Sequence, residues 1–181
     1  MERYKISEGA VIYYVTFSVT QWLPIFVRQQ PCMIVVDSLN HCIREKGLLV
    51  GAYVLMPTHL HAVIGDRDED VSRLAGTVND LRKFTGRELA NWCDQHGPEA
   101  FRRATREDAG EDRDRRIWQP SKHPEAVRSE EFLNTKIGYM HQNPVRAGLV
   151  RQPEHWRFSS AGWYASGGEE EADVSITWLA W

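Results

Sequence analysis

Residues 48–65, LLVGAYVLMPTHLHAVIG, contain two apolar runs separated by a Pro-Thr turn. Both runs have the length and composition of β-strands, and the proline interrupts the first, so the segment predicts a β-hairpin with strands at Leu48–Met56 and 59–65. In the second strand His59 and His61 alternate with apolar residues. Because side chains two residues apart point to the same side of a strand, both imidazoles are expected on one face and the apolar residues in the core.

The flanking segments extend this hairpin into a larger sheet with helices. Residues 10–20, AVIYYVTFSVT, are β-branched and aromatic, which predicts a strand. Segment Gln29–Lys46 has apolar residues at helical spacing and is followed by Gly47, a natural C-cap. A second helix is predicted over residues 71–92, from its cap region and its periodicity.

The second half of the chain adds one more helix. Residues 97–116 are polar and dense in charge, and predict a loop or partly disordered insertion. Residues 129–143 predict a helix with Ser129 as N-cap and Pro144 as its end. The order β-α-β-β-α with a further helix matches an α+β, ferredoxin-like βαββαβ plan, with an antiparallel sheet and helices on one face. One strand is unplaced, near residues 116–119 or elsewhere.

Composition indicates a single globular domain of a cytosolic protein. Of the 181 residues, 42% are hydrophobic and 26% charged. We expect a catalytic domain over residues 1–164 and an acidic, Trp-containing tail over 165–181. The three cysteines fit neither a disulfide framework nor a zinc site, and neither a signal peptide nor a membrane-spanning run is evident, so a cytoplasmic location is predicted.

Net charge gives a mixed indication about nucleic acids. The total of −3 argues mildly against such a partner, but residues 71–157 hold 16 Lys and Arg against 13 Asp and Glu. Basic and aromatic side chains there are candidates for phosphate contact and base stacking, or form an ordinary solvated face. These candidates are Arg82, Lys83, Arg87, Trp118, Gln119 and Lys122.

Two groups of residues could carry chemistry. The imidazoles of His59 and His61 could form half of a divalent-metal site, or be polar residues on the solvated face of a strand. On the helix at 129–143, Lys136, Tyr139 and Asn143 form one polar stripe at spacings of three and four. Tyr139 could be a nucleophile assisted by a cation and a metal, or a surface tyrosine, and Asn143 could only cap a turn.

Three stretches together resemble a known family. They are YVLMPTHLHAVIG at 53–65, LRKFTGRELANW at 81–92, and IWQPSKHPEAVRSEEFLNTKIGYMHQNPVRAGLV at 117–150, continued by HWRFSSAGWY at 155–164. In content, order and spacing they are similar to the IS200-like tyrosine transposases of the HUH nuclease superfamily, in particular the REP-associated branch. The tail that contains Trp178 and Trp181 has no counterpart in this pattern.

The resemblance implies a role for each matching residue. His59, His61 and Asn143 would bind Mg²⁺ or Mn²⁺, and Tyr139 would attack single-stranded DNA beside a hairpin, leaving a 5′-phosphotyrosine and a free 3′-hydroxyl. Lys136 and Arg146 would join the DNA-contacting residues. The hairpin would belong to REP-like elements or transposon ends. Related enzymes occur as monomers and as dimers, so the oligomeric state stays open.

Three other functions have to be weighed against this one. A non-catalytic regulator on the same scaffold would bind hairpins without needing a metal. Relaxase-type nucleases share paired histidines but place them in a different context from the Tyr-x-x-x-Asn-Pro-Val run. A small-molecule metal hydrolase would require a further strong ligand near the histidines, and the sequence shows no such spacing.

Overall fold

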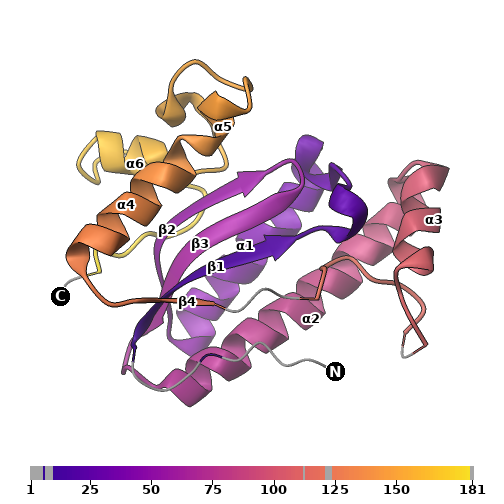
Figure 1. The fold of residues 1–181 in the computed structure, drawn as a ribbon, viewed down its shortest axis with the longest axis horizontal. Helices are drawn as coiled ribbons and strands as arrows, with labels where there is room; N and C mark the ends of the chain where they lie inside the picture. The colour runs from indigo at the N-terminus through magenta and orange to yellow at the C-terminus, as the bar shows by residue number, and fades with distance from the viewer. Residues whose placement is uncertain (1–5, 7–9, 112, 121–123, 180–181) are drawn as a thin grey trace.

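A four-stranded antiparallel sheet organises the molecule (Figure 1). The structure, a computed structural model, describes the chain except for residues 1–5, 7–9, 112, 121–123 and 180–181. The strands lie in the order β2-β3-β1-β4, and each neighbouring pair is antiparallel. Their bounds are Ile12–Ser18 for β1, Leu48–Met56 for β2, His59–Asp66 for β3 and Glu125–Val127 for β4. With β3 inserted between β1 and β2, this order confirms the α+β, ferredoxin-like prediction.

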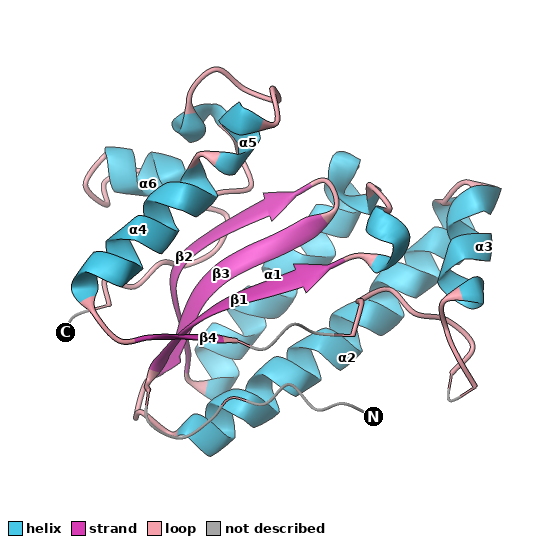
Figure 2. Ribbon diagram, viewed as in Figure 1, coloured by secondary structure: helices cyan, strands magenta, loops and turns pink. Residues whose placement is uncertain are grey.

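Helices cover both faces of the sheet (Figure 2): two lie on one face, as predicted, and the further helix, whose face the sequence did not assign, lies on the other. Helices α1 (Gln29–Lys46) and α2 (Val71–His96) bury their apolar sides against one face, which forms the larger core. Helix α4 (Glu130–His141) packs on the opposite face through Leu133, Ile137 and Met140. The predicted caps are observed, because Gly47 is left-handed with φ 70° and Ser129 accepts a hydrogen bond from the amide of Phe132.

The remaining helices are short. They are α3 (Glu99–Glu107), α5 (Asn143–Arg146) and α6 (Ala161–Ala165), with 3₁₀ turns at Thr20–Trp22, Ile25–Val27 and Pro153–His155. The loop predicted for residues 97–116 is therefore wrong over α3. The buried positions of this helix are Ala104 and Thr105, which are too small and polar to show an apolar periodicity in sequence.

The fourth strand lies outside the segment 116–119. Trp118 forms only an isolated bridge with Val19, whereas β4 pairs with Ile12–Tyr14 at the start of β1. With three residues, β4 is too short for a recognisable alternation, and its pairing with β1 defines it. Pro144 also acts differently from the prediction, since α4 already ends at His141 and Pro144 lies in the first turn of α5, after Asn143.

The C-terminal segment packs along the outer edge of β2. The amide of Thr177 donates to the carbonyl of Val50 at 2.9 Å, and Val174 is fully buried in the larger core. Asn40 of α1 hydrogen-bonds to the backbone of Asp173 and Ser175. In the described part of the chain, no helix combines the length and apolar character needed to cross a membrane.

Candidate functional site

The two histidines of β3 lie side by side on the face of the sheet that α4 covers. Their ring centroids are 4.7 Å apart, and the ring planes are inclined by 75°. Val63 continues this face into the smaller core with α4, whereas Leu60 and Ala62 point into the core beneath α1 and α2. The predicted separation of imidazoles from apolar side chains is therefore confirmed, and it follows from the two-residue period of the strand.

Each imidazole has one nitrogen engaged by a threonine. Thr58 Oγ1 lies 2.9 Å from His59 Nδ1, and Thr16 Oγ1 on β1 lies 2.8 Å from His61 Nδ1. Among the side chains that the structure describes, none hydrogen-bonds the Nε2 atom of either ring. If Nδ1–H donates to the hydroxyl, the lone pair of each Nε2 is available to a ligand, which is how metal-binding histidines are usually oriented.

Burial keeps both histidines neutral at pH 7. It lowers the pKa of His59, and it lowers the pKa of His61 to about 3, with further contributions from His59 and Lys136. The neutral form is the one whose nitrogen lone pair can bind a cation.

Lys136 of α4 points toward the sheet. Its ammonium group lies 4.8 Å from the ring centroid of Tyr14 on β1 and pairs with Glu125 Oε2 of β4 at 2.6 Å. Tyr14 in turn stacks on His61, with centroids 5.4 Å apart and the rings inclined by 23°. Lys136, which the sequence placed beside Tyr139, is therefore connected to His61 by way of the Tyr14 ring, which it contacts and which stacks on His61.

Tyr139 and Asn143 are joined by Arg146. The guanidinium of Arg146 lies over the Tyr139 ring, 4.1 Å from its centroid, and its Nη2 donates to the Tyr139 carbonyl at 2.6 Å and to Asn143 Oδ1 at 2.8 Å. The Tyr139 side chain is 54% exposed and accessible to a large substrate. The buried Nδ2 of Asn143 has no hydrogen-bond partner among the residues that the structure describes.

Among the described residues, no hydrogen bond or ring contact joins Tyr139 to either histidine. Tyr14 lies between the two groups. Burial raises the pKa of its phenol, and Tyr139 and Arg146 are close enough to act on it electrostatically. Within the described ranges, no three His, Cys, Asp or Glu side chains converge, and the expected ligand set contains an asparagine instead.

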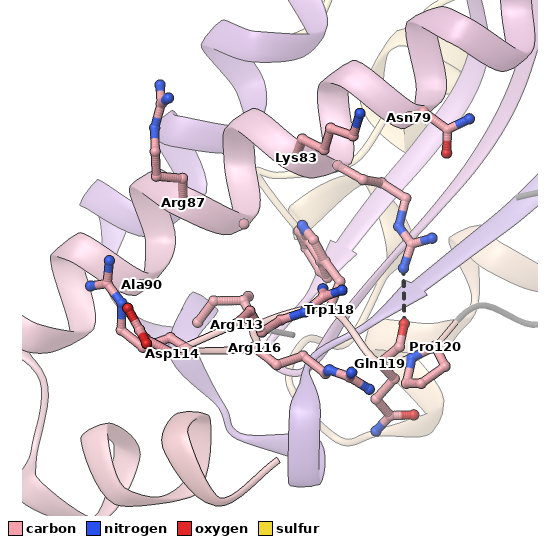
Figure 3. A pocket seen from close by; sticks show the side chains of 14 residues that line it. Asn79, Lys83, Arg87, Ala90, Arg113, Asp114, Arg116, Trp118, Gln119 and Pro120 are labelled. Carbon is pink, nitrogen blue, oxygen red and sulfur yellow. Dashed lines mark hydrogen bonds between the residues drawn. The ribbon is translucent and has the colours of Figure 1, made fainter. Parts of the chain in front are cut away.

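A basic cleft of about 840 Å³ opens between α2 and the segment 113–120 (Figure 3). Its charged lining is six cations and one carboxylate: Arg82, Lys83, Arg87, Arg113, Arg115, Arg116 and Asp114. Three of the predicted phosphate-contacting residues thus share one surface with arginines of the 97–116 insertion. Arg82 Nη2 donates to the carbonyl of Gln119 at 2.8 Å, which ties the two walls together.

Trp118 and Gln119 also line this cleft, but Trp118 does not offer a face for stacking. Its side chain is 7% exposed, packs beside Phe17 and Phe26, and donates from Nε1 to Thr85 Oγ1. The predicted stacking role of Trp118 is therefore wrong, because its large apolar ring is buried in the core. Lys122 lies outside the described residues.

The cleft reaches the end of the sheet that carries His59. The amide of Gln119 donates to the carbonyl of Ser18 at 2.8 Å, and Ser18 is the register partner of His59. Adjacent strands lie roughly 5 Å apart, so Gln119 is about two strand spacings from the histidine.

Sequence reasoning missed several residues around the histidines. Tyr14 and Thr16 alternate on β1 and face the pair, a pattern that a two-residue period could have revealed once β1 was paired with β3. Trp22, whose ring centroid lies 6.1 Å from that of His59, comes from a turn with no strand or helix periodicity.

Comparison with known proteins supports the resemblance found in the sequence. No protein-family model matches the chain. A protein of Escherichia coli (strain K12) named REP-associated tyrosine transposase is 23% identical over 128 residues. That match covers 67% of this chain and 62% of the relative, so the chain spans less than two thirds of the relative's length.

One solved structure shows a shared fold. A REP-associated tyrosine transposase bound to a REP hairpin superposes with a TM-score of 0.64 and 17% identity, covering 100% of this chain and 95% of that one. A second structure, from Deinococcus radiodurans and provisionally described as a transposase, gives a TM-score of 0.47 with 18% identity, covering 78% and 97%. The resemblance to REP-associated tyrosine transposases is thus found in both sequence and structure.

Proposed function

We propose that this chain, which resembles the REP-associated tyrosine transposases, is a metal-dependent endonuclease and strand transferase for single-stranded DNA beside a hairpin. The observation that carries the proposal is the histidine pair. Burial favours the neutral form of both rings, no described side chain hydrogen-bonds their Nε2 atoms, and they lie on the sheet face covered by the helix that bears Tyr139.

The donor set fits a divalent cation such as Mg²⁺ or Mn²⁺. His59 and His61 would supply nitrogens and Asn143 its carboxamide oxygen, a mixture that these ions accept. Asn143 Oδ1 already accepts from Arg146, but a carbonyl oxygen has two lone pairs and can accept both. When bound, the ion would polarise the scissile phosphate and offset the negative charge that builds on it.

Tyr139 would be the nucleophile. Its phenolic oxygen attacks phosphorus, the phenolic proton is lost to solvent, and the bond from phosphorus to the 3′ oxygen breaks. The products are a 5′-phosphotyrosine and a 3′-hydroxyl that takes up a proton. Because one phosphodiester replaces another, a later attack by a 3′-hydroxyl can rejoin strands without a nucleotide cofactor.

Arg146 would assist at the same place. Its guanidinium lies over the Tyr139 ring and would meet the phosphate that the phenol attacks, where a fixed cation favours the negatively charged transition state. The basic cleft on α2 would bind the DNA backbone, despite the net charge of −3, because phosphate contacts depend on local charge.

A non-catalytic hairpin-binding regulator is the second candidate. The observation in its favour is that Lys136 is paired with Glu125, so that one cation near the site is already neutralised. Such a protein would bind hairpin DNA equally well without metal and without Tyr139.

A covalent-adduct assay distinguishes the two. Purified protein is mixed with labelled single-stranded hairpin oligonucleotides drawn from repeats that flank its gene, with and without Mn²⁺, and run on a denaturing gel. We expect a metal-dependent adduct that Tyr139→Phe and His61→Ala abolish. Two matched controls, Tyr164→Phe and His155→Ala, change residues outside the site and should retain it. Hairpin binding without an adduct would reject the enzymatic function in favour of the regulator.

A further inference from the structure

Trp22 is an exposed aromatic side chain beside the histidine pair. It is 55% exposed, and its indole meets the His59 ring at an interplanar angle of 84°, with the centroids 6.1 Å apart. By contrast, Trp92 and Trp118 are at least nine-tenths buried. Leaving a ring of this size in water forgoes much of its hydrophobic stabilisation, and it keeps the Trp22 ring accessible to a ligand that reaches the histidine pair.

The turn that holds Trp22 has an unfavourable backbone. Gln21 and Trp22 have φ angles of 48° and 56°, in the left-handed region that residues other than glycine seldom adopt. Such conformations persist where the surroundings enforce them, and they cluster at functional sites.

Hydrogen bonds from three directions fix this turn. The amide of Trp22 donates to Val19 at 3.0 Å, the amide of Val19 donates to Thr58 at 2.9 Å, and the amide of Thr20 donates to Ile117 at 2.6 Å. Thr58 precedes His59, and Ile117 belongs to the wall of the basic cleft. The turn therefore joins the histidine strand to the cleft, and its position is set by both.

We infer that Trp22 is the platform on which a nucleobase next to the cleaved phosphate stacks, an inference that rests on the proposed function. A strand whose phosphate lies at His59 and whose backbone continues into the cleft would pass near this turn, because the turn is hydrogen-bonded both to Thr58, beside His59, and to Ile117 in the cleft wall. Proteins that bind single strands combine a basic groove with aromatic side chains of this kind, and every base offers a face for stacking. Trp22 thus takes the role that the sequence suggested for the buried Trp118.

The test measures affinity for DNA in a Tyr139→Phe background, where no covalent capture interferes. Fluorescence anisotropy follows a labelled hairpin with a single-stranded flank, and a set of otherwise identical strands carries one abasic position each. Trp22→Ala is expected to weaken binding about 5- to 100-fold, the range that loss of one base–aromatic stack produces. Trp22→Phe should retain most of the affinity. Trp178→Ala is the matched control, since Trp178 is 57% exposed and packs on Trp163 and Tyr164.

The abasic series separates stacking from a purely structural role. At one flank position the missing base should weaken binding to the Trp22 protein and have no further effect on Trp22→Ala. If Trp22→Ala weakens binding by the same factor for every abasic strand and for the intact strand, Trp22 only orients His59. That result would overturn the inference. So would unchanged binding by Trp22→Ala, or an absence of binding by the parent protein.

The same experiment keeps the inference distinct from the proposed enzymatic function. If the wild-type protein forms the Tyr139 adduct but the abasic series shows no coupling to Trp22, the function stands and the platform is rejected. If the coupling is present and no adduct forms, Trp22 stacks a base of the bound strand, but the catalytic proposal fails and with it the place of that base beside a cleaved phosphate.

Discussion

At the scale of single residues, two half-buried histidines and one buried histidine have different hydrogen-bond surroundings. His59 and His61 have one nitrogen held by a threonine and the other without a hydrogen bond from the described side chains. His141, at the end of α4, is 8% exposed, and its Nε2 lies 2.8 Å from Ser160 Oγ. Its ring lies against the aromatic ring of Tyr164, with the centroids 5.3 Å apart, so it is suited to packing.

His141 is expected to make stability depend on pH. Burial lowers its pKa from the ordinary 6.5 to about 4. Between these values the unfolded chain binds the proton and the folded chain does not, so the free energy of unfolding falls as pH falls from about 6.5 to about 4. From this one group the loss should reach roughly 3 kcal/mol and then level off.

Urea unfolding at a series of pH values measures this effect. The variant His141→Gln should lose less stability than the wild type over the same interval, whereas exposed His155→Gln should follow the wild type. If the free energy of unfolding depends on pH in the same way for wild type and His141→Gln, the pKa of His141 does not differ between the folded and unfolded chains, and the prediction is wrong.

At the scale of elements, α4 links the fold to the chemistry. Its apolar stripe belongs to the cluster that also contains Tyr14, Val54 and Val63 of the sheet. Tyr139 is next to fully buried Met140, so the packing of one side chain sets the position of the other. Helices of 12 residues are marginal alone, and this contact is what holds α4 in place.

Met140→Ala should test that link. Truncation of a buried methionine is expected to cost about 2–5 kcal/mol, because it leaves a cavity between α4 and the sheet. We expect the rate of Tyr139 adduct formation to fall with it, as the proposed nucleophile becomes less well positioned.

The matched variant is Met140→Leu, which nearly conserves volume and should cost less than about 1.5 kcal/mol. Denaturant unfolding and adduct kinetics are compared for the two variants under conditions in which both are folded. An adduct rate that stays at the wild-type level in folded Met140→Ala would separate the position of Tyr139 from the packing of α4.

At the scale of the whole molecule, the chain covers the outer edge of its own sheet. Along β2, the amide of Leu55 donates to Phe158, the amide of Ser160 donates to Tyr53, and the amide of Thr177 donates to Val50. The side chain of Leu179 lies against Gly51, where an added Cβ would come within 2.4 Å of it. An uncovered strand edge is a template for pairing with another chain, and this arrangement blocks it.

Removal of residues 167–181 should therefore promote self-association. The truncated chain loses the contact at Val50 and the burial of Val174, and exposes part of the β2 edge. Sedimentation velocity over a range of concentrations is expected to show larger species than for the full chain, together with a lower melting temperature. Trp178→Ala keeps the edge covered and should sediment as the full chain does. Identical sedimentation of truncated and full chains would mean that the tail does not protect the edge.

The sequence by itself determined what depends on near neighbours. The alternation at His59 and His61, the periodicity of α1 and α2 and the caps Gly47 and Ser129 all involve residues within a few positions of one another. Local sterics and hydrogen bonds govern such features, so they can be read from the order of residues. The resemblance to the transposases rests on the same local motifs.

Only the tertiary structure decided which distant residues meet. It buried Trp118 against Thr85, brought Thr16 to His61 and placed Trp22 beside His59. It also set the three residues of β4 against β1 and engaged Arg146 with Asn143. Most of these contacts join segments separated by tens of residues, and whether a ring is buried or exposed depends on what the rest of the chain packs against it. The local sequence does not show which rings are buried, because burial is decided by the packing of the whole molecule.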